Sequence, residues 1–313
     1  MRNAPPSWSL ISIEQLTRSD LEELFAAAYR HRSALESGEP CSMSSEAIVA
    51  TLFMQPSTRT RLSFEAAALR LGGKILSMSD PAASRAGSEW KESLADTARV
   101  LNGYADVVVL RHPVVGSAAH YATMSTVPVV NGGDGAGPGS EHPTQTILDL
   151  FTIDDLCGSV DGATVCVLGD LSQRCVHSLL AGLSLFSDVT VLAKTEETTR
   201  LTERELQRHA RHGLKVEYVD DLAEALRRSD IVYACGHEDP THEIPLDMRL
   251  DPRTLRGARP DLRILHPLPR GVELPTSLDG TAHAAYFEQA ANGVPVRMAV
   301  LERILSSCGS AVA

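Results

Sequence analysis

The sequence predicts an α/β protein with two domains, each a parallel β-sheet flanked by helices, joined by interdomain helices. The first observation is that short β-branched runs alternate with longer segments of helical periodicity, which is typical of repeated β-α-β units. The second is the length of 313 residues, which exceeds what one core usually serves and favours two domains of about 150 residues. The third is a glycine-rich segment at 132–139, which separates the predicted strands into two groups.

The elements follow one another in a regular order. The predicted strands are Ala47–Met54, Lys74–Met78, Ala105–Leu110, Val127–Asn131, Ala163–Leu168, Val189–Leu192, Lys215–Tyr218, Asp230–Ala234 and Leu262–Leu265. The clearest helices are Arg59–Leu71, Lys91–Leu101, Pro143–Leu156 and Arg174–Phe186, most of them closed by a glycine. A last helix covers about Ala284–Leu305. We place the first domain at 1–141 and the second at 142–284, and we expect the C-terminal helix, 285–313, to pack back on the first domain.

Composition excludes several classes of function. A net charge of −11 argues against non-specific binding to nucleic acid or to an anionic membrane, because both need a basic face. No apolar run approaches the ~20 residues of a membrane span. The six cysteines include no CxxC pair, so buried reduced thiols are expected in place of a zinc site. The N-terminal residues lack the apolar stretch of a signal peptide, and the expected compartment is the cytoplasm.

The run Ser57-Thr-Arg-Thr-Arg61 follows an apolar strand and opens a helix. Free backbone N–H groups, the helix dipole, hydroxyls and a guanidinium together make a cradle for an oxyanion. Taken alone, the run is equally a serine N-cap followed by a solvated arginine face. The glycine-rich segment is interpreted as an irregular hinge loop, because a proline intervenes before the next helix where a dinucleotide-binding turn would need a tight connection.

Five segments, taken in order, resemble the aspartate and ornithine carbamoyltransferases. They are Phe53-Met-Gln-Pro-Ser-Thr-Arg-Thr-Arg-Leu-Ser-Phe-Glu65, Glu92-Ser-Leu-Ala-Asp-Thr97, Arg111-His-Pro113, Gly133-Asp-Gly135 with His142-Pro-Thr-Gln145, and His266-Pro-Leu-Pro-Arg270. The likeness extends to Tyr286-Phe-Glu-Gln and Asn292-Gly, so it covers nearly the whole chain. It implies that the first domain binds carbamoyl phosphate, that the second binds the amine acceptor, and that the aspartate enzymes are the nearer relatives.

The resemblance implies which of the matched residues are catalytic and which bind carbamoyl phosphate. Attack of an amine on carbamoyl phosphate places negative charge on the carbonyl oxygen, so hydrogen-bond donors around that oxygen should dominate the rate. The expected catalytic residues are Arg59, Thr60, Arg111 and His142. The residues expected to bind carbamoyl phosphate are these four with Ser57, Thr58, Gln145, Pro267 and Leu268. No metal or cofactor is expected, since phosphate leaves readily and arginine supplies the positive charge.

The acceptor site departs from the family pattern. Arg174, at the start of a helix, is the candidate for the acceptor α-carboxylate, in a loop one residue shorter than usual. Where the aspartate enzymes carry Arg-x-Gln, this chain has Tyr233-Ala-Cys-Gly-His-Glu-Asp-Pro-Thr-His-Glu-Ile, which is acidic and lacks arginine. Arg249 is a possible substitute. L-Aspartate is the default acceptor, and another amine-bearing small molecule is the alternative. The ornithine enzymes fit less well, because they have cysteine where this chain has Pro267.

The resemblance also implies an assembly. Ser84 and Lys91 are candidates for acceptor-site residues contributed by a neighbouring subunit, which predicts a homotrimer with shared active sites; a solvated loop is the plainer interpretation of both. A regulatory chain cannot be inferred. A second class of function, a non-catalytic paralogue that binds a metabolite, is disfavoured because the phosphate and carbonyl residues are all present.

Overall fold

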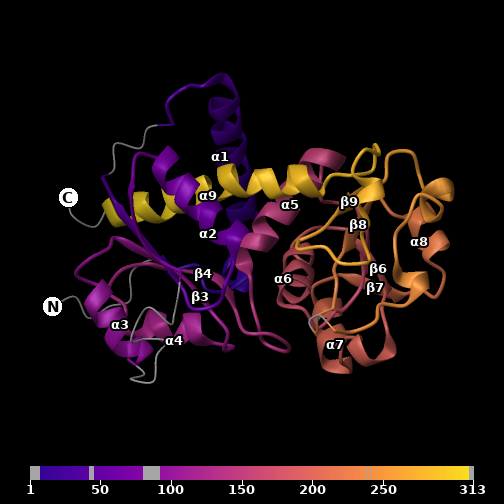
Figure 1. Cartoon of the computed structure of the whole chain (residues 1–313), viewed down its shortest axis with the longest axis horizontal. Helices are drawn as coiled ribbons and strands as arrows, with labels where there is room; N and C mark the ends of the chain where they lie inside the picture. Colours follow the sequence, from indigo (N-terminus) through magenta and orange to yellow (C-terminus); the bar gives the residue numbers. More distant parts are fainter. Residues whose placement is uncertain (1–7, 42–45, 80–91, 238, 240, 310–313) are drawn as a thin grey trace. The chain divides into compact units, whose positions relative to one another are not determined.

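The computed structural model describes residues 8–41, 46–79, 92–237, 239 and 241–309. The chain divides into two compact units, which are Met1–Thr144 with Asn292–Ala313, and Gln145–Ala291 (Figure 1). Each unit holds one fully parallel sheet, so the predicted α/β class is confirmed. The change from one unit to the other falls inside helix α5 (Pro143–Cys157) and again inside helix α9 (Tyr286–Gly309).

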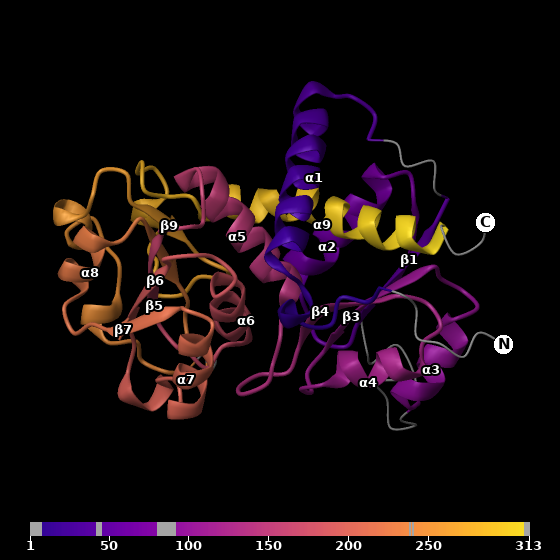
Figure 2. The same ribbon diagram turned by 180° about the vertical axis from the view of Figure 1, so that it is seen from behind.

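The sheet of unit 1 has the strand order β2-β1-β3-β4. Its strands are β1 (Ile48–Phe53), β2 (Lys74–Met78), β3 (Val107–His112) and β4 (Val129–Asp134). Its helices are η1 (Ile13–Gln15), α1 (Arg18–Ser37), α2 (Thr58–Arg70), α3 (Leu94–Leu101) and α4 (Ser117–Met124). In Figures 1 and 2, α3 and α4 lie on one side of this sheet, and α1 and α2 lie on the other. Buried aliphatic side chains of β1 and β3 pack against α3 and α4.

Two helix boundaries in unit 1 depend on capping side chains. The helix predicted from Lys91 starts at Leu94, because Ser93 accepts a hydrogen bond from the backbone N–H of Asp96 and so acts as the N-cap. Helix α1 was not among the clearest predicted helices, yet its start has a capping box between Thr17 and Asp20. That box is visible in the sequence as a signal for a helix start.

The glycine-rich segment contributes to β4, which corrects part of the prediction. Gly132 and Gly133 belong to the strand, and the irregular loop begins only after Asp134. A Cβ atom at Gly132 would lie 3.3 Å from the carbonyl oxygen of Leu110 on β3, so a side chain there would require the neighbouring strand to shift by a few tenths of an ångström. The backbone of Asp134 then pairs with that of Glu141, which closes the loop directly before His142.

The sheet of unit 2 has the order β7-β6-β5-β8-β9. Its strands are β5 (Thr164–Leu168), β6 (Thr190–Lys194), β7 (Lys215–Tyr218), β8 (Ile231–Ala234) and β9 (Arg263–Leu265). Its helices include α6 (Arg174–Leu183), α7 (Glu203–Arg211) and α8 (Leu222–Arg228), with single turns η3 (Glu197–Thr199), η4 (Leu246–Met248), η5 (Thr254–Gly257) and η6 (Thr276–Leu278). Helices α6 and α8 lie on opposite sides of the sheet in both views. All nine predicted strands are therefore present, each with boundaries shifted by no more than a few residues.

The C-terminal half of α9 packs on unit 1. Glu302 accepts a hydrogen bond from His31 of α1 at 3.0 Å, and Arg303 forms an ion pair with Asp20. The guanidinium of Arg297 lies 5.0 Å from the ring centre of Phe64 on α2. These contacts hold residues 292–309 to the first unit, whereas residues 286–291 belong to the second.

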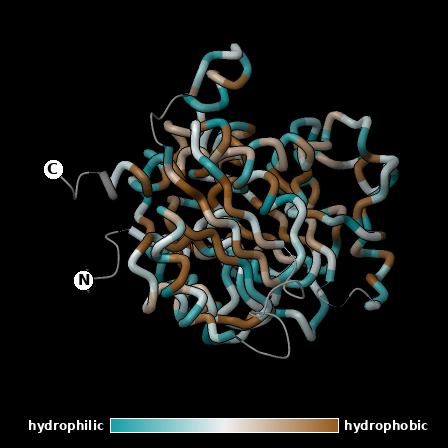
Figure 3. The backbone as a smooth tube through the Cα atoms, turned by 60° about the vertical axis from the view of Figure 1, so that its left-hand side comes forward, coloured by the Kyte–Doolittle hydropathy of each residue, from teal (hydrophilic) through white to brown (hydrophobic). Residues whose placement is uncertain are grey.

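Hydrophobic stretches of the backbone trace alternate with hydrophilic turns, as the β-α-β pattern requires (Figure 3). Within the described part of the chain, every helix is too short or too polar to span a bilayer.

Candidate functional site

The first candidate site lies where the strand order of unit 1 changes direction. In the order β2-β1-β3-β4, the chain runs outward from β1 to β2 and then returns to place β3 on the other side of β1. Loops that leave the carboxyl ends of the strands on either side of such a point diverge and open a crevice, where ligands bind in open α/β sheets. Ser57, the N-cap of α2, and Thr58–Thr60, its first turn, follow β1, and the end of β3 carries Arg111.

The N-terminus of α2 presents its first residues in different directions. Ser57 occupies the N-cap position with extended backbone, but its side chain makes no capping hydrogen bond, so the hydroxyl is not used within the helix. Thr58 and Arg59 are exposed, and Thr60 is buried. Arg61 turns elsewhere, donating to the hydroxyl of Ser77 at 3.3 Å. Ser57 to Thr60 therefore lie together at the helix start, where the sequence predicts an anion cradle, whereas the side chain of Arg61 points to Ser77.

Three predicted site residues meet at the imidazole of His142. Its Nε2 lies 3.4 Å from Oγ1 of Thr60 and 3.4 Å from Nη1 of Arg111. All three side chains are buried. Since a guanidinium has only donors, Arg111 donates and Nε2 of His142 accepts. Arg111 also donates to the carbonyl oxygen of Gly132 at 3.0 Å, which fixes the guanidinium at the end of the sheet.

Gly133 provides the space in which this cluster forms. Its φ is +108°, and a Cβ atom built there would lie 2.5 Å from Nη1 of Arg111 and 3.1 Å from Cδ2 of His142. Both the backbone conformation and the close approach therefore require glycine. The sequence gives this residue only as part of a matched motif, and its steric role depends on the fold.

His112, next to Arg111 in the same motif, has a structural role. Its Nδ1 accepts hydrogen bonds from the N–H of Val114 at 3.0 Å and from the hydroxyl of Ser117 at 2.7 Å. Burial lowers the pKa of His112, so its imidazole is neutral near pH 7. It holds the turn that leads into α4.

In unit 2, a buried carboxylate holds Gln145, another predicted site residue. Asp149 accepts hydrogen bonds from Nε2 of Gln145 at 2.8 Å, from Nε2 of Gln289 at 2.6 Å and from the hydroxyl of Tyr233 at 2.9 Å. The pKa of Tyr233 is raised well above its usual value, first by burial and then by the charge of Asp149. Asp149 was not identified from the sequence, because nothing local distinguishes it from other polar residues of a helix, and Gln289 was included only as part of the matched segment Tyr286-Phe-Glu-Gln, without a role.

The segment around Pro267 and Leu268 is held by His266. Nδ1 of His266 accepts from the N–H of Leu268 at 2.8 Å, and Nε2 donates to Glu273 at 3.0 Å. Burial alone would raise the pKa of Glu273, but hydrogen bonds from His266 and from the N–H of Gly271 keep it below the usual value. Leu268 has a φ of +57°, which is uncommon for a residue with a branched side chain. Glu273 is a further residue that sequence reasoning did not identify.

The second candidate site lies at the corresponding point of unit 2, between β5 and β8. Gly169, directly after β5, has a φ of +128°, and a Cβ atom there would lie only 1.8 Å from the carbonyl oxygen of Cys235 after β8. The two loops therefore meet closely, and Gln173 donates to the carbonyl of Gly236 at 2.6 Å. Arg174 begins α6 immediately after this loop, as the sequence predicted for the acceptor site.

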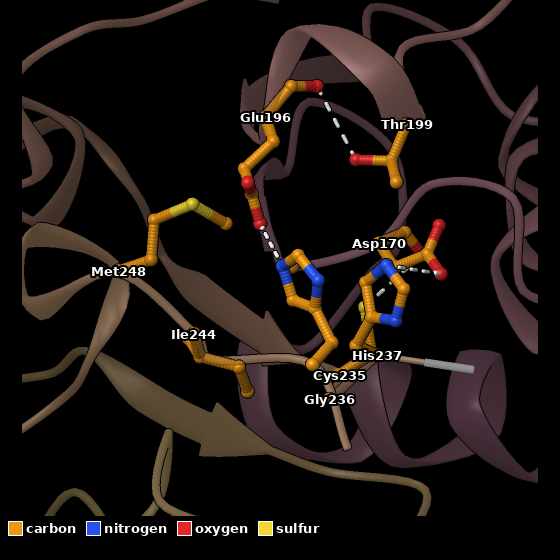
Figure 4. Close-up of a pocket in the computed structure, with 10 residues that line it drawn as sticks. Asp170, Glu196, Thr199, Cys235, Gly236, His237, Ile244 and Met248 are labelled. Atoms are coloured by element: carbon orange, nitrogen blue, oxygen red, sulfur yellow. Dashed lines mark hydrogen bonds and ion pairs between the residues drawn. The ribbon is translucent and has the colours of Figure 1, made fainter. Parts of the chain in front are cut away.

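A small pocket beside these loops, which is also lined by residues that follow β6 and by η4, combines histidine and carboxylate side chains (Figure 4). It is lined by Gly169, Asp170, Glu196, Thr199, Cys235, Gly236, His237, His242, Ile244 and Met248. The rings of His237 and His242 stack with centroids 3.8 Å apart. His242 lies 2.6 Å from Glu196, and His237 lies 3.8 Å from the buried carboxylate of Asp170. Among the described lining residues, none is arginine or lysine.

Arg249 does not line this pocket. Its Nε and Nη2 donate to the carbonyl oxygen of Ile244 at 2.8 and 2.5 Å, so the guanidinium holds the backbone of the segment that follows β8. We call this segment the acceptor loop, because the resemblance places the expected acceptor site there. Ser84 and Lys91, the candidates for a shared site, lie outside the described residues. Among the side chains that the structure describes, no group of three histidine, cysteine or acidic residues is arranged to hold a metal ion.

Comparison with known proteins places both units in one family. A model of the aspartate/ornithine carbamoyltransferase carbamoyl-P binding domain matches residues 9–155, and a model of the Asp/Orn binding domain of the same family matches residues 161–304. The chain is 40% identical to the aspartate carbamoyltransferase catalytic subunit of Methanothrix thermoacetophila, over 95% of this chain and 97% of the relative. It is 38% identical to that of Archaeoglobus fulgidus, over 95% and 98%.

Solved structures agree with the sequence relatives. The catalytic subunit of aspartate transcarbamoylase from M. Jannaschii superimposes with a TM-score of 0.86 at 34% identity, covering 95% of this chain and 98% of that one. Aspartate transcarbamoylase from Trypanosoma cruzi, solved in complex with carbamoyl phosphate and aspartate, gives 0.87 at 33% identity, with 96% of each chain covered. With both family models matched and relatives that are 38–40% identical over nearly the whole chain, this chain belongs to the aspartate/ornithine carbamoyltransferase family.

Proposed function

We propose that this chain transfers the carbamoyl group of carbamoyl phosphate to the amino group of a small acceptor, with L-aspartate as the default acceptor and N-carbamoyl-L-aspartate and phosphate as products. The observation that carries the proposal is the convergence of Thr60 and Arg111 on His142, beside the N-terminus of α2. The relatives named above are aspartate carbamoyltransferases, and one is solved with carbamoyl phosphate and aspartate bound.

The proposed chemistry has two parts, which are binding of the phosphate by Ser57 to Thr60 and polarisation of the carbonyl by Thr60, Arg111 and His142. Ser57, Thr58, Arg59 and Thr60 would bind the phosphate with hydroxyls, a guanidinium and the free N–H groups of a helix start. The hydroxyl of Thr60, the guanidinium of Arg111 and the imidazole of His142 would donate to the carbonyl oxygen as negative charge develops there. For His142 this requires the proton on Nε2, so substrate would displace the present contact with Arg111.

On the acceptor side, Arg174 would bind the α-carboxylate, because it starts a helix next to the crevice of unit 2. The amide of Gln145 and the backbone of Pro267 and Leu268 would orient the carbamoyl amide. The amine then attacks the carbonyl carbon, the bond to the phosphate oxygen breaks, and phosphate leaves with both electrons of that bond. The amine loses one proton in the process.

Isotopic transfer tests this proposal directly. Carbamoyl phosphate labelled in the carbamoyl carbon is incubated with the chain and L-aspartate, and labelled N-carbamoyl-L-aspartate is separated by chromatography. We expect stoichiometric release of phosphate, and a loss of at least 10²-fold in kcat for His142→Ala, which removes one donor to the oxyanion. Folded wild-type protein that forms no carbamoylated product from any amine would contradict the proposal and favour a binding protein.

A different acceptor is a second candidate, favoured by the pocket between β5 and β8. The carboxylates of Asp170 and Glu196 line it, together with two histidines, and no described lining residue is arginine or lysine. A substrate carboxylate about 4 Å from such a charge costs on the order of a few kcal/mol near a protein surface. An acceptor whose side chain donates hydrogen bonds or carries a positive charge would be stabilised at the same place.

A panel of three acceptors of similar size separates the two candidates. L-Aspartate, L-asparagine and L-2,3-diaminopropionate present a carboxylate, an amide and an ammonium group to the pocket. If the pocket selects hydrogen-bond donors, kcat/KM for one of the last two exceeds that for aspartate, and Glu196→Gln reduces the difference. Turnover of aspartate at a kcat/KM well above both others would exclude the second candidate.

We also infer a homotrimer in which Ser84 and Lys91 reach the active site of a neighbouring subunit. Unit 1 exposes several large apolar side chains, on more than one side of its sheet, that burial between subunits would remove from water, namely Leu62, Leu69, Leu76, Val100, Tyr104, Val114 and Val115. Sedimentation gives the mass of the assembly. Mixing Lys91→Ala with His142→Ala after dissociation and reassembly should restore part of the activity if sites are shared, and it should restore none if each site lies within one chain.

A further inference from the structure

We propose that Asp149 is a positioning residue for carbamoyl recognition, which sets the orientation of two side-chain amides, those of Gln145 and Gln289. The proposal deepens the proposed function and rests on it, because it concerns how the carbamoyl amide is recognised. It requires only contacts within unit 2.

The first step is the burial and bonding of the carboxylate. Asp149 lies in α5 with no exposed surface, and it accepts hydrogen bonds from three neutral donors. Two donors, Nε2 of Gln145 and Nε2 of Gln289, share Oδ1, and the hydroxyl of Tyr233 donates to Oδ2. Burying a carboxylate costs free energy of folding unless its oxygens accept hydrogen bonds from nearby donors. Such a group holds its donors in one arrangement.

The second step concerns the two ends of the Gln145 amide. A side-chain amide can turn over, exchanging its NH₂ and its carbonyl oxygen, and the hydrogen-bond network decides which end faces which partner. A carboxylate only accepts, so the NH₂ of Gln145 must face Asp149. The carbonyl oxygen of Gln145 is therefore directed away from the carboxylate, and it is an acceptor. An acceptor is the group that the NH₂ of a carbamoyl compound needs.

The third step is that Gln289, whose amide is oriented by Asp149 in the same way, fixes the backbone of the segment His266 to Leu268. With its NH₂ fixed on Asp149, its carbonyl oxygen accepts the N–H of His266 at 2.7 Å. His266 in turn accepts the N–H of Leu268 through Nδ1 at 2.8 Å. The backbone carbonyls of this segment, which would also accept from the carbamoyl NH₂, are thus held through Gln289.

One carboxylate therefore orders acceptors from two separate parts of the sequence. Gln145 stands at the start of α5, whereas His266 to Leu268 follow β9. Replacing Asp149 with asparagine keeps the shape of the side chain but replaces one carboxylate oxygen with an NH₂ group, which is a donor. Because the three partners of Asp149 are also donors, the Gln145 amide is then free to turn over. A donor would then face the donor of the substrate.

The test compares carbamoyl phosphate with acetyl phosphate, which has a methyl group in place of the NH₂. The KM for carbamoyl phosphate and the inhibition constant of acetyl phosphate are measured for wild type and for Asp149→Asn. We expect the KM to rise about tenfold or more, in line with the loss of a hydrogen bond and its replacement by a donor–donor contact. The inhibition constant for acetyl phosphate should change less than about twofold, since no hydrogen bond to the methyl group exists to be lost. General damage to the fold would weaken both.

A double-mutant cycle adds a second criterion. If Asp149 acts through Gln145, then Asp149→Asn should raise the KM much less in a Gln145→Ala background than in wild type. Purely additive effects would overturn the positioning role. Ser229→Ala is the matched control, because Ser229 is equally buried in unit 2 and its hydroxyl donates to the backbone carbonyl of Ala225 at 2.8 Å. It should leave both constants unchanged.

Two further outcomes separate this proposal from the proposed function. If wild type binds acetyl phosphate as tightly as carbamoyl phosphate, amide recognition itself is absent and the proposed function is wrong. If wild type discriminates between the two and Asp149→Asn discriminates equally well, only the positioning role is wrong. Should Asp149→Asn fail to fold, Gln289→Met removes the link to His266 alone, and it should reduce the same discrimination while acetyl phosphate binding is kept.

Discussion

Replacing Gly133 with alanine should inactivate the enzyme without unfolding it. The added Cβ would lie 2.5 Å from Nη1 of Arg111, whereas ordinary contacts begin near 3.4 Å. The guanidinium must therefore move by about 1 Å, and His142 must also yield, because its Cδ2 would be 3.1 Å away. Misplacing a catalytic group by about 1 Å can reduce the rate about 10²-fold, and losing one oxyanion donor costs about 10²- to 10³-fold.

The same chain offers a matched control for this substitution. Gly137 also has a positive φ, +75°, but a Cβ atom there would meet nothing within 4 Å. Both alanine variants should lose about 1 kcal/mol or somewhat more of stability from the strained backbone. Only Gly133→Ala should lose at least 10²-fold in kcat.

The assay is steady-state phosphate release with saturating acceptor, combined with thermal unfolding of each variant. Folded Gly133→Ala protein with a kcat within threefold of Gly137→Ala would refute the reasoning. It would mean that Arg111 and His142 are not needed at the positions where the structure places them.

Three other substitutions test separate parts of the molecule. Arg59→Ala should cost at least ~3 kcal/mol of transition-state stabilisation, about 10²-fold in kcat/KM, while Arg61→Ala, outside the cradle, should cost far less. Arg249→Met should raise the acceptor KM about tenfold or more with little change for carbamoyl phosphate, because it releases the carbonyl of the acceptor loop. Burial lowers the pKa of His209 from 6.5 to about 4, so His209 binds a proton in the unfolded chain before it does so in the folded chain as the pH falls. The free energy of unfolding should therefore drop by up to about 3 kcal/mol between pH 6.5 and 4. A His209→Gln variant should show a smaller drop over the same range.

The strands and the helix start at Ser57 to Thr60 were predictable from the sequence. Parallel strands buried on both faces appear in a sequence as continuous apolar runs, and capping residues mark helix starts, so both signals are local. The prediction that Ser57 to Thr60 bind an anion rests on a local pattern too, that of a strand, a short polar turn and a helix. The boundary of β4 was not predictable, because the close approach at Gly132 involves a neighbouring strand.

Only the tertiary structure decided how distant residues combine. The contacts of Thr60 and Arg111 with His142, and the hydrogen bonds from Tyr233 and Gln289 to Asp149, join segments separated by tens of residues or more, so no local sequence pattern predicts them. The acceptor pocket shows the same division. The sequence by itself determined that an arginine is absent after Tyr233, whereas the fold placed Glu196 and Asp170 against the histidines. Charge at a site depends on which loops meet at the edge of the sheet, and that depends on the order of the strands.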